Sequence, residues 1–253
     1  MSSSPGSWTT VEVAGHACHL YEPPEAGPHG YVVLYLHGVH QGRLSEQAAF
    51  CEAFARYGLR VICPVTKRSW WTDRICEEFD RQITAERYVL DKVLPYVAER
   101  FSSAPPKVAL LGTSMGGQGA LRFAYKYPNV FPVVAALAPA VDYQIRIEDY
   151  EDETLPLMYA DPEEARQDTA LLHIHPLNWP RHQFFCCDPL DDRWWNSSDR
   201  LAMKLRSLGV PFECDLETSA GGHGFEYYNH MAERAIGFLV ERLEKERLRL
   251  PVE

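Results

Sequence analysis

Short apolar segments alternate with longer amphipathic segments along most of the chain. The short segments are rich in β-branched residues and lie between Gly, Pro and Asp, which is typical of buried strands, whereas the longer ones repeat apolar residues at helical spacing. The predicted strands are Trp8–Val13, Cys18–Glu22, Tyr31–His37, Leu59–Pro64, Lys107–Gly112, Val133–Ala138, Gln183–Cys187 and Phe212–Glu217. The predicted helices are Ser45–Tyr57, Cys76–Ala98, Gly116–Tyr127, Asp199–Leu208 and Met231–Leu248. Asp199 is expected to cap the fourth helix and Gly209 to end it.

The order of these elements predicts the fold class. The first two strands form a hairpin that turns at Gly15, and strands and helices alternate after it. This order predicts an α/β fold, a mostly parallel sheet of eight strands with helices on both faces. The 253 residues suffice for one such domain over 1–253. Residues 142–180 break the alternation with acidic and Pro-rich sequence, and two alternatives remain open for them: a small cap over the ligand-binding edge of the sheet, or a solvated connection.

Charge and hydropathy exclude two classes of partner. The formal net charge of -10 argues against nucleic acid, because phosphate backbones attract basic surfaces. No stretch approaches the roughly 18 consecutive apolar residues that a membrane span requires, so no membrane partner is expected. Residues 1–6 lack the basic and apolar regions of a secretory signal, and we expect them to form a frayed tail.

The cysteines indicate a reducing compartment. There are seven, and none are spaced as C-x-x-C. Cys63, Cys186 and Cys187 lie in apolar strands and are predicted to be buried thiols rather than metal ligands or disulfides. This usage predicts a cytoplasmic protein. The sequence leaves the oligomeric state open, with a homodimer as one alternative.

The segment from Gly112 to Gly117 carries the most specific chemistry. It places Ser114 where a buried strand turns into a helix. Gly112 and Gly116 lack a Cβ, so the backbone can fold tightly around Ser114 and expose its hydroxyl. The free N–H groups of the helix start then point at whatever that oxygen attacks. A turn of this composition can be purely structural, but its position between strand and helix predicts a nucleophile.

A serine hydroxyl needs a base, and the base needs an acid. Among ten histidines, His223 is the candidate base because it lies between the last strand and the last helix with glycines on both sides. The acid is expected after the strand that ends at Cys187. Asp191 is the predicted acid and Asp192 the next candidate, while Asp188 can instead close the turn at the end of the strand.

The oxyanion of an acyl-transfer intermediate requires two N–H donors. One is expected from Met115, directly after the nucleophile, and the other from Val39 in the loop after the third strand. His40 is the alternative donor and a candidate pocket residue. His37 and His40 have no third ligand at a suitable spacing, so we expect neither a zinc site nor any other metal or cofactor.

Aromatic residues flank the loops of the predicted active edge. Trp70, Trp71 and Trp195 are candidate pocket residues, because ligand sites are largely apolar with few polar anchors. Packing of these loops onto the core is an equally supported alternative. The same two alternatives apply to Trp194 and to Tyr227–Tyr228.

These motifs resemble those of the α/β-hydrolase superfamily, in the branch of esterases that includes esterase D and S-formylglutathione hydrolase. The resemblance rests on the stretches Gly112–Leu121, Glu86–Tyr88 and Gly221–Phe225 and on His37-Gly38. It extends over residues 30–240. The chain order of serine, acid and histidine is also the order expected of this superfamily.

The resemblance and the site residues together imply a serine carboxylic ester hydrolase. It would act through an acyl-enzyme on small-molecule esters with short acyl groups. Alternatives on the same fold are a serine peptidase, an acyltransferase, a thioester hydrolase resembling S-formylglutathione hydrolase, and a binding protein without activity. A peptidase normally needs a further domain, and a binding protein has no need of the complete serine, acid and histidine set.

Overall fold

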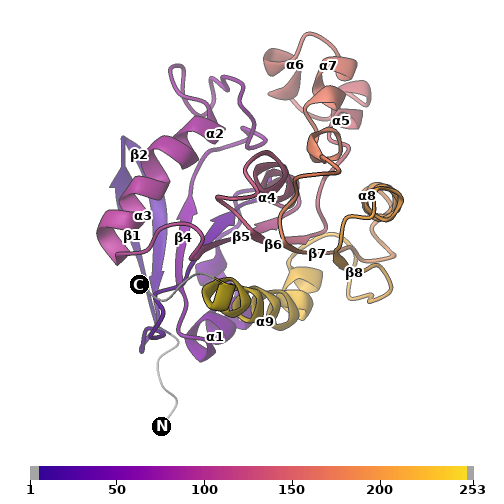
Figure 1. Ribbon diagram of the computed structural model, residues 1–253. Coiled ribbons are helices and arrows are strands. Elements are labelled where there is room, and N and C mark those ends of the chain that lie inside the picture. Colours follow the sequence, from indigo (N-terminus) through magenta and orange to yellow (C-terminus); the bar gives the residue numbers. More distant parts are fainter. Residues whose placement is uncertain (1–5, 250–253) are drawn as a thin grey trace.

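The computed structural model describes residues 6–249, so residues 1–5 of the expected N-terminal tail lie outside the described part of the chain. Its strands are β1 (Ser7–Val13), β2 (His16–Glu22), β3 (Val32–Leu36), β4 (Arg60–Pro64), β5 (Val108–Thr113), β6 (Val133–Leu137), β7 (His182–Cys186) and β8 (Glu213–Asp215). They form one eight-stranded sheet in the order β1-β2-β4-β3-β5-β6-β7-β8 (Figure 1). β1 and β2 make the predicted hairpin, β2 runs antiparallel to β4, and the six strands from β4 to β8 are parallel. The predicted α/β class is confirmed.

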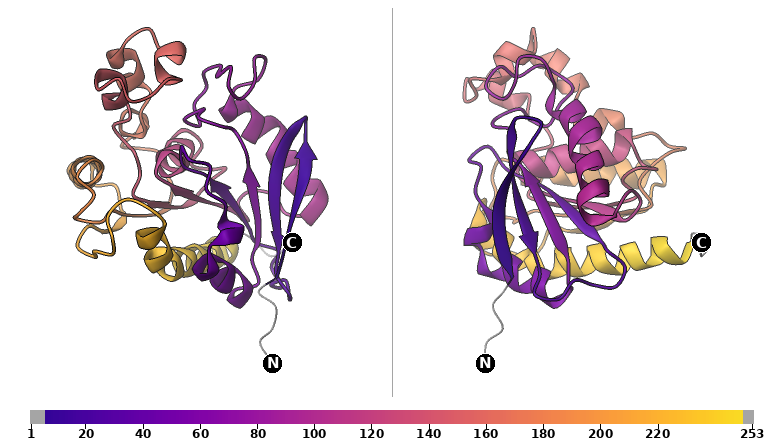
Figure 2. Two further views of the ribbon diagram at one scale, coloured as in Figure 1. Left: turned by 180° about the vertical axis from the view of Figure 1, so that it is seen from behind. Right: turned by 90° about the vertical axis from the view of Figure 1, so that its left-hand side faces the viewer.

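Helices cover both faces of this sheet. The longer ones are α1 (Ala48–Arg56), α3 (Leu94–Phe101), α4 (Met115–Lys126), α8 (Trp195–Leu208) and α9 (Phe225–Arg249). α1 and α9 pack together on one face, and α3, α4 and α8 lie on the other (Figure 1, Figure 2). Because both faces are covered, every residue of the central strands β3, β5 and β6 is buried. No helix within residues 6–249 is long and apolar enough to cross a membrane.

The predicted helix at 76–98 begins later in the structure. Residues 76–84 form turns, and the helix starts with α2 (Ala85–Tyr88), continues through the π-helical segment η2 (Val89–Val93) and ends with α3. The carboxylate of Asp80 accepts the backbone N–H groups of Gln82 and Ile83 at 2.6 and 3.1 Å. This side-chain turn competes with helix formation, because it offers the backbone other acceptors.

The fourth predicted helix also begins elsewhere. Asp199 does not cap it, because α8 starts four residues earlier at Trp195. No side chain of the described residues caps α8 at its N-cap residue, Trp194; Asp191 accepts the backbone N–H of Trp194 itself at 3.0 Å, in the turn that leads into the helix. Gly209 ends the helix as predicted, in the left-handed conformation with φ +68°.

Residues 142–180 form a small lobe beside α4 (Figure 1). The lobe contains α5 (Ile145–Glu148), α6 (Leu155–Met158), α7 (Pro162–Gln167) and the 3₁₀ helix η3 (Ala170–His173). It follows β6, at the edge of the sheet where the parallel strands end. We call this lobe the insertion.

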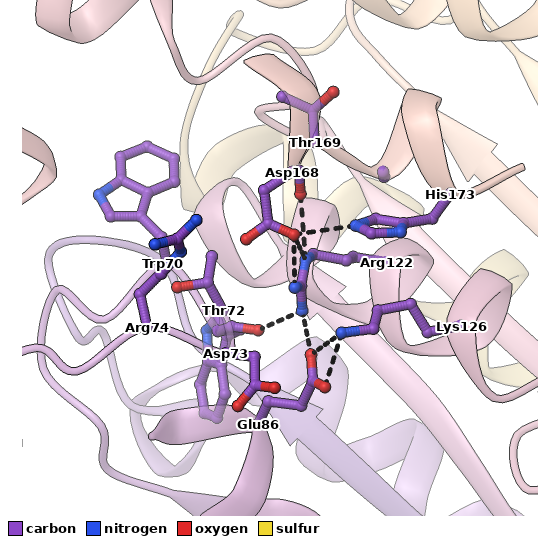
Figure 3. A network of polar contacts seen from close by, with 12 residues as sticks. Trp70, Thr72, Asp73, Arg74, Glu86, Arg122, Lys126, Asp168, Thr169 and His173 are labelled. Carbon is purple, nitrogen blue, oxygen red and sulfur yellow. Dashed lines mark hydrogen bonds and ion pairs between the residues drawn. The ribbon is translucent and has the colours of Figure 1, made fainter. Parts of the chain in front are cut away.

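A buried polar network joins the insertion to α4 and α2 (Figure 3). At its centre is Arg122 of α4, which is only 1% exposed. Its guanidinium is ion-paired with Glu86 of α2 on one side and lies 2.6 Å from Asp168 of the insertion on the other. Lys126 also pairs with Glu86 at 2.7 Å, and the hydroxyl of Tyr159 donates to Asp168 at 2.7 Å.

The two carboxylates of this network remain ionised. Burial by itself raises the pKa of Asp168, but a hydrogen bond from His173 and the charge of Arg122 outweigh it and hold this pKa below its ordinary value. Burial likewise raises the pKa of Glu86, and Arg122 together with Lys126 lowers it below its ordinary value. Both carboxylates therefore depend on the same buried cation.

We expect Arg122→Met to lower the free energy of unfolding by about 3–5 kcal/mol, because it leaves buried carboxylates without their shared partner. Urea denaturation followed by circular dichroism measures this loss. Arg166→Met is the matched control, since Arg166 forms an exposed pair with Glu163 on α7; it should leave the denaturation midpoint unchanged. Equal midpoints for the two variants would contradict a structural role for the network.

Candidate active site

Ser114 lies in the sharp turn between β5 and α4. Its φ of +54° is in the left-handed region that residues other than glycine rarely adopt. Close packing enforces the turn. A Cβ on Gly116 would lie 1.8 Å from the carbonyl oxygen of Leu36, and a Cβ on Gly112 would lie 2.0 Å from the carbonyl oxygen of Gly116. The backbone N–H of Ser114 also donates to the carbonyl of Leu137 at 3.0 Å. The backbone thus presents the serine hydroxyl at the carboxyl edge of the sheet.

His223 reaches this hydroxyl from the loop before α9. Its Nε2 atom lies 2.9 Å from Ser114 Oγ, and its Nδ1 atom lies 2.6 Å from Asp191 Oδ2. Burial by itself raises the pKa of Asp191, but the hydrogen bond and charge of His223 hold it below its ordinary value. An imidazole bound in this way can accept a hydroxyl proton at Nε2 while an ionised carboxylate stabilises its protonated form.

The three candidate acids lie in different surroundings. Asp191 is buried beside the His223 ring, and its other oxygen accepts the N–H of Trp194. Asp192 is exposed to solvent. Asp188 is fully buried but contacts backbone groups rather than the imidazole.

Asp188 holds together the two loops that carry the acid and the histidine. One oxygen accepts the N–H of Leu190 and the hydroxyl of Ser219, both at 2.8 Å. The other accepts the N–H groups of Ala220 and Gly222 at 2.6 and 2.9 Å. The sequence indicates only the first of these functions, the closing of the turn after β7, because the partner loop lies more than thirty residues away.

The loop after β3 is anchored by His37. The N–H of Thr66 donates to His37 Nε2 at 3.1 Å, so the ring proton is on Nδ1 and donates to the carbonyl of Gly38 at 2.9 Å. Burial lowers the pKa of His37 to about 4, which keeps the ring neutral. Gly38 packs against the nucleophile turn, since a Cβ there would lie 3.3 Å from Ser114 Cβ. Val39 follows directly and faces the same cavity as Ser114.

Ser114 opens into a cavity of about 310 Å³. The walls come from the loop after β3, the loop of Asp191, the first turn of α9 and the insertion. Of the predicted pocket residues, His40 and Trp70 line this cavity. Aromatic residues that also line it are Trp194, Phe225 and Tyr228.

The other two predicted pocket residues lie elsewhere, which corrects the prediction. Trp71 is fully buried, packs against Gly119 and donates its indole N–H to the carbonyl of His37 at 3.1 Å. Trp195 donates its indole N–H to the carbonyl of Leu216 at 3.0 Å. In each pair of tryptophans one ring lines the cavity and its neighbour packs against the protein.

Tyr228 is a site residue that the sequence does not single out. Its hydroxyl lies 3.1 Å from His223 Nε2, so it shares that nitrogen with Ser114. Burial raises the pKa of Tyr228 well above its ordinary value, which keeps the hydroxyl protonated. The sequence offers two adjacent tyrosines, and only the folded helix distinguishes them: Tyr227 is fully buried and does not line the cavity.

The mostly parallel sheet, the serine turn and the histidine loop define the class of the protein, the α/β-hydrolase fold. A family model described as "Putative esterase" matches residues 18–207. Because this match covers most of the chain, the protein belongs to this esterase family and is an enzyme that hydrolyses carboxylic esters. No curated protein matches the sequence.

Solved structures share the fold over nearly the whole chain. FphF, a fluorophosphonate-binding serine hydrolase of Staphylococcus aureus, is 18% identical with a TM-score of 0.71, over 94% of this chain and 99% of its own. An S-formylglutathione hydrolase from Agrobacterium tumefaciens is 18% identical with a TM-score of 0.73, over 96% of this chain and 98% of its own. A ferulic acid esterase is 16% identical with a TM-score of 0.72, over 94% of this chain and 98% of its own.

We expect Asp188→Ala to lower kcat for p-nitrophenyl acetate by about 100-fold, because loss of the shared acceptor lets the His223 loop shift, and a shift of about 1 Å can cost that much. KM should change little, since Asp188 does not line the cavity. Steady-state kinetics on folded variants measure both constants. Asp192→Ala, at the exposed neighbouring aspartate, is the control, and equal kcat values for the two would refute the positioning role.

Proposed function

We propose that the protein is a serine carboxylic ester hydrolase in which Ser114 is the nucleophile, His223 the general base and Asp191 the acid. The observation that carries this proposal is the continuous pair of hydrogen bonds, 2.9 and 2.6 Å, that links the three side chains at the base of the cavity. The separation of Ser114 Oγ and Nε2 is within the range required for proton transfer.

The reaction proceeds in two halves. Ser114 Oγ attacks the ester carbonyl carbon while His223 Nε2 takes its proton, and the carbonyl oxygen becomes an oxyanion. The C–O bond to the alcohol then breaks, His223 returns the proton to the leaving oxygen, and the acyl group remains on Ser114. In the second half, His223 takes a proton from water, which attacks the acyl carbon. The C–O bond to Ser114 then breaks, His223 gives the proton to Ser114 Oγ, and the carboxylic acid and free serine are released.

The oxyanion is stabilised by two backbone N–H groups. Met115 is the first residue of α4, where the N–H groups have no partner within the helix. Val39 is the proposed second donor, and His40 is the alternative. Support for this loop comes from the close approach of Gly38 to Ser114 and from the cavity that Val39 and Ser114 both line.

The substrate is a small-molecule ester. A cavity of about 310 Å³ is at the lower end of the range for ligand pockets, which supports the prediction of short acyl groups. Hydrolysis of thioesters would use the same residues, and the similarity in fold to an S-formylglutathione hydrolase makes thioesters a necessary part of a substrate panel. The cytoplasmic location and the homodimer stay predictions of the sequence.

We expect Ser114→Ala to lower kcat for p-nitrophenyl acetate by at least about 10⁴-fold, because no other group can carry the acyl intermediate. The variant should also lose labelling by a fluorophosphonate probe, measured by intact-protein mass spectrometry. Its melting temperature should match that of the wild type, since the hydroxyl lies in the cavity. Undiminished turnover, or labelling of the variant, would exclude Ser114 as the nucleophile.

We expect Asp191→Asn to lower kcat by about 10⁴-fold, because the amide no longer stabilises the charged imidazole or its productive tautomer. Asp192→Asn is the matched control at the exposed neighbour and should retain full activity. Steady-state hydrolysis of p-nitrophenyl acetate by both variants distinguishes the two candidate acids. A larger loss in the Asp192 variant would transfer the acid role to that residue.

A further inference from the structure

Two arginines lie in the wall of the cavity that contains Ser114. Arg146 belongs to α5 of the insertion, and Arg193 follows Asp191 by two residues. Among the described residues that line the cavity, these are the only arginines or lysines, and Asp191 is the only carboxylate. Because Asp191 is bound to His223, no carboxylate of the wall neutralises the two arginines from the cavity side.

Arg193 is held in place from behind. Its guanidinium carbon lies 5.9 Å from the centre of the Trp194 ring. Its Nη2 atom donates to Glu151 at 2.7 Å and its Nη1 atom to Asp149 at 3.4 Å. Neither carboxylate lines the cavity. These contacts fix the orientation of the guanidinium before any ligand arrives.

Arg146 is less fully engaged. Its guanidinium carbon lies 5.9 Å from the centre of the Trp70 ring. Within residues 6–249, only one of its five N–H groups makes a hydrogen bond, to the carbonyl of Glu151 at 3.0 Å. The nearest carboxylate oxygens are those of Asp152 at 3.7 Å and Glu151 at 3.9 Å, both beyond hydrogen-bonding distance. Asp152 already accepts hydrogen bonds from Trp70 and from the backbone of Thr154. Arg146 therefore keeps donors for a further anion.

We propose that Arg146 and Arg193 select esters that carry a carboxylate away from the ester bond. Guanidinium groups bind carboxylates through paired N–H donors, which gives orientation as well as affinity. The protein has a net charge of -10, so this cationic wall is a local feature and not a consequence of overall composition. The inference rests on the proposed function, because it assigns the class of substrate to the same site.

The test uses two pairs of substrates in which one member carries a carboxylate away from the scissile ester and the other carries an uncharged group at the same position. The first pair is the mono-p-nitrophenyl ester of adipic acid and p-nitrophenyl hexanoate, which places the carboxylate on the acyl side. The second is 4-acetoxybenzoate and its methyl ester, which places it on the alcohol side. For at least one pair, kcat/KM of the wild type should favour the anionic ester by about tenfold or more. Added salt should reduce this preference.

Arg146→Met and Arg193→Met should each bring the ratio of anionic to neutral kcat/KM towards one, mainly through the KM of the anionic ester. Methionine retains much of the apolar stem while removing the charge. Arg166→Met, which removes an exposed arginine of the insertion outside the cavity, should keep the wild-type ratio. Arg193→Lys retains the charge without the paired donors and should give an intermediate ratio.

The outcomes separate this inference from the function on which it rests. A wild type that hydrolyses the neutral esters with no preference in either pair overturns the inference and leaves the proposed function intact. A preference that persists in both methionine variants also overturns it. If no ester is hydrolysed and Ser114 is not labelled by a fluorophosphonate, the proposed function fails and the inference fails with it.

Discussion

The contact of Gly116 with the carbonyl oxygen of Leu36 is the constraint on which the site depends. It seats the start of α4 directly over the end of β3, where no side chain fits between them. This approach brings Ser114 against Gly38, so close packing at glycines positions the proposed nucleophile beside the proposed oxyanion loop, which the His37 ring also anchors. The positive φ of Ser114 is sterically unfavourable, and the close packing of Gly112 and Gly116 around the turn holds the residue in it.

The opposite side of the site depends on two aspartates from one loop, which bind different parts of the loop that carries His223. Asp188 binds the backbone of the histidine loop, whereas Asp191 binds the ring that this loop carries. Asp191 also accepts the N–H of Trp194, the residue before α8, so the same carboxylate binds the turn that leads into this helix and the imidazole. The position of His223 therefore has two independent supports, one to its main chain and one to its side chain.

The sequence predicts the parts of this arrangement that are encoded locally. The turn at Ser114 and the loop at His223 could be found because glycines beside a polar residue mark them within a few positions. The start of α8 could not be found, because its N-cap residue, Trp194, makes no side-chain capping hydrogen bond and is not a residue type that marks a helix start. The choice between Trp70 and Trp71 also requires the tertiary structure, since adjacent residues in a loop have no fixed period and their directions depend on what packs against them.

The insertion takes part in the site through α4, the helix that directly follows Ser114. Gln118 of α4 donates to the carbonyl of Trp70 at 3.2 Å and accepts the N–H of Ala170 at 3.1 Å, one turn before Arg122 anchors the same lobe. A solvated connection would have no reason to share two buried polar contacts with α4, so these contacts support a cap. The wall that Trp70 contributes is thus held by Gln118, the same side chain that binds the insertion at Ala170. Changes in that buried network should therefore alter which esters fit beside Ser114 without touching the residues proposed to react.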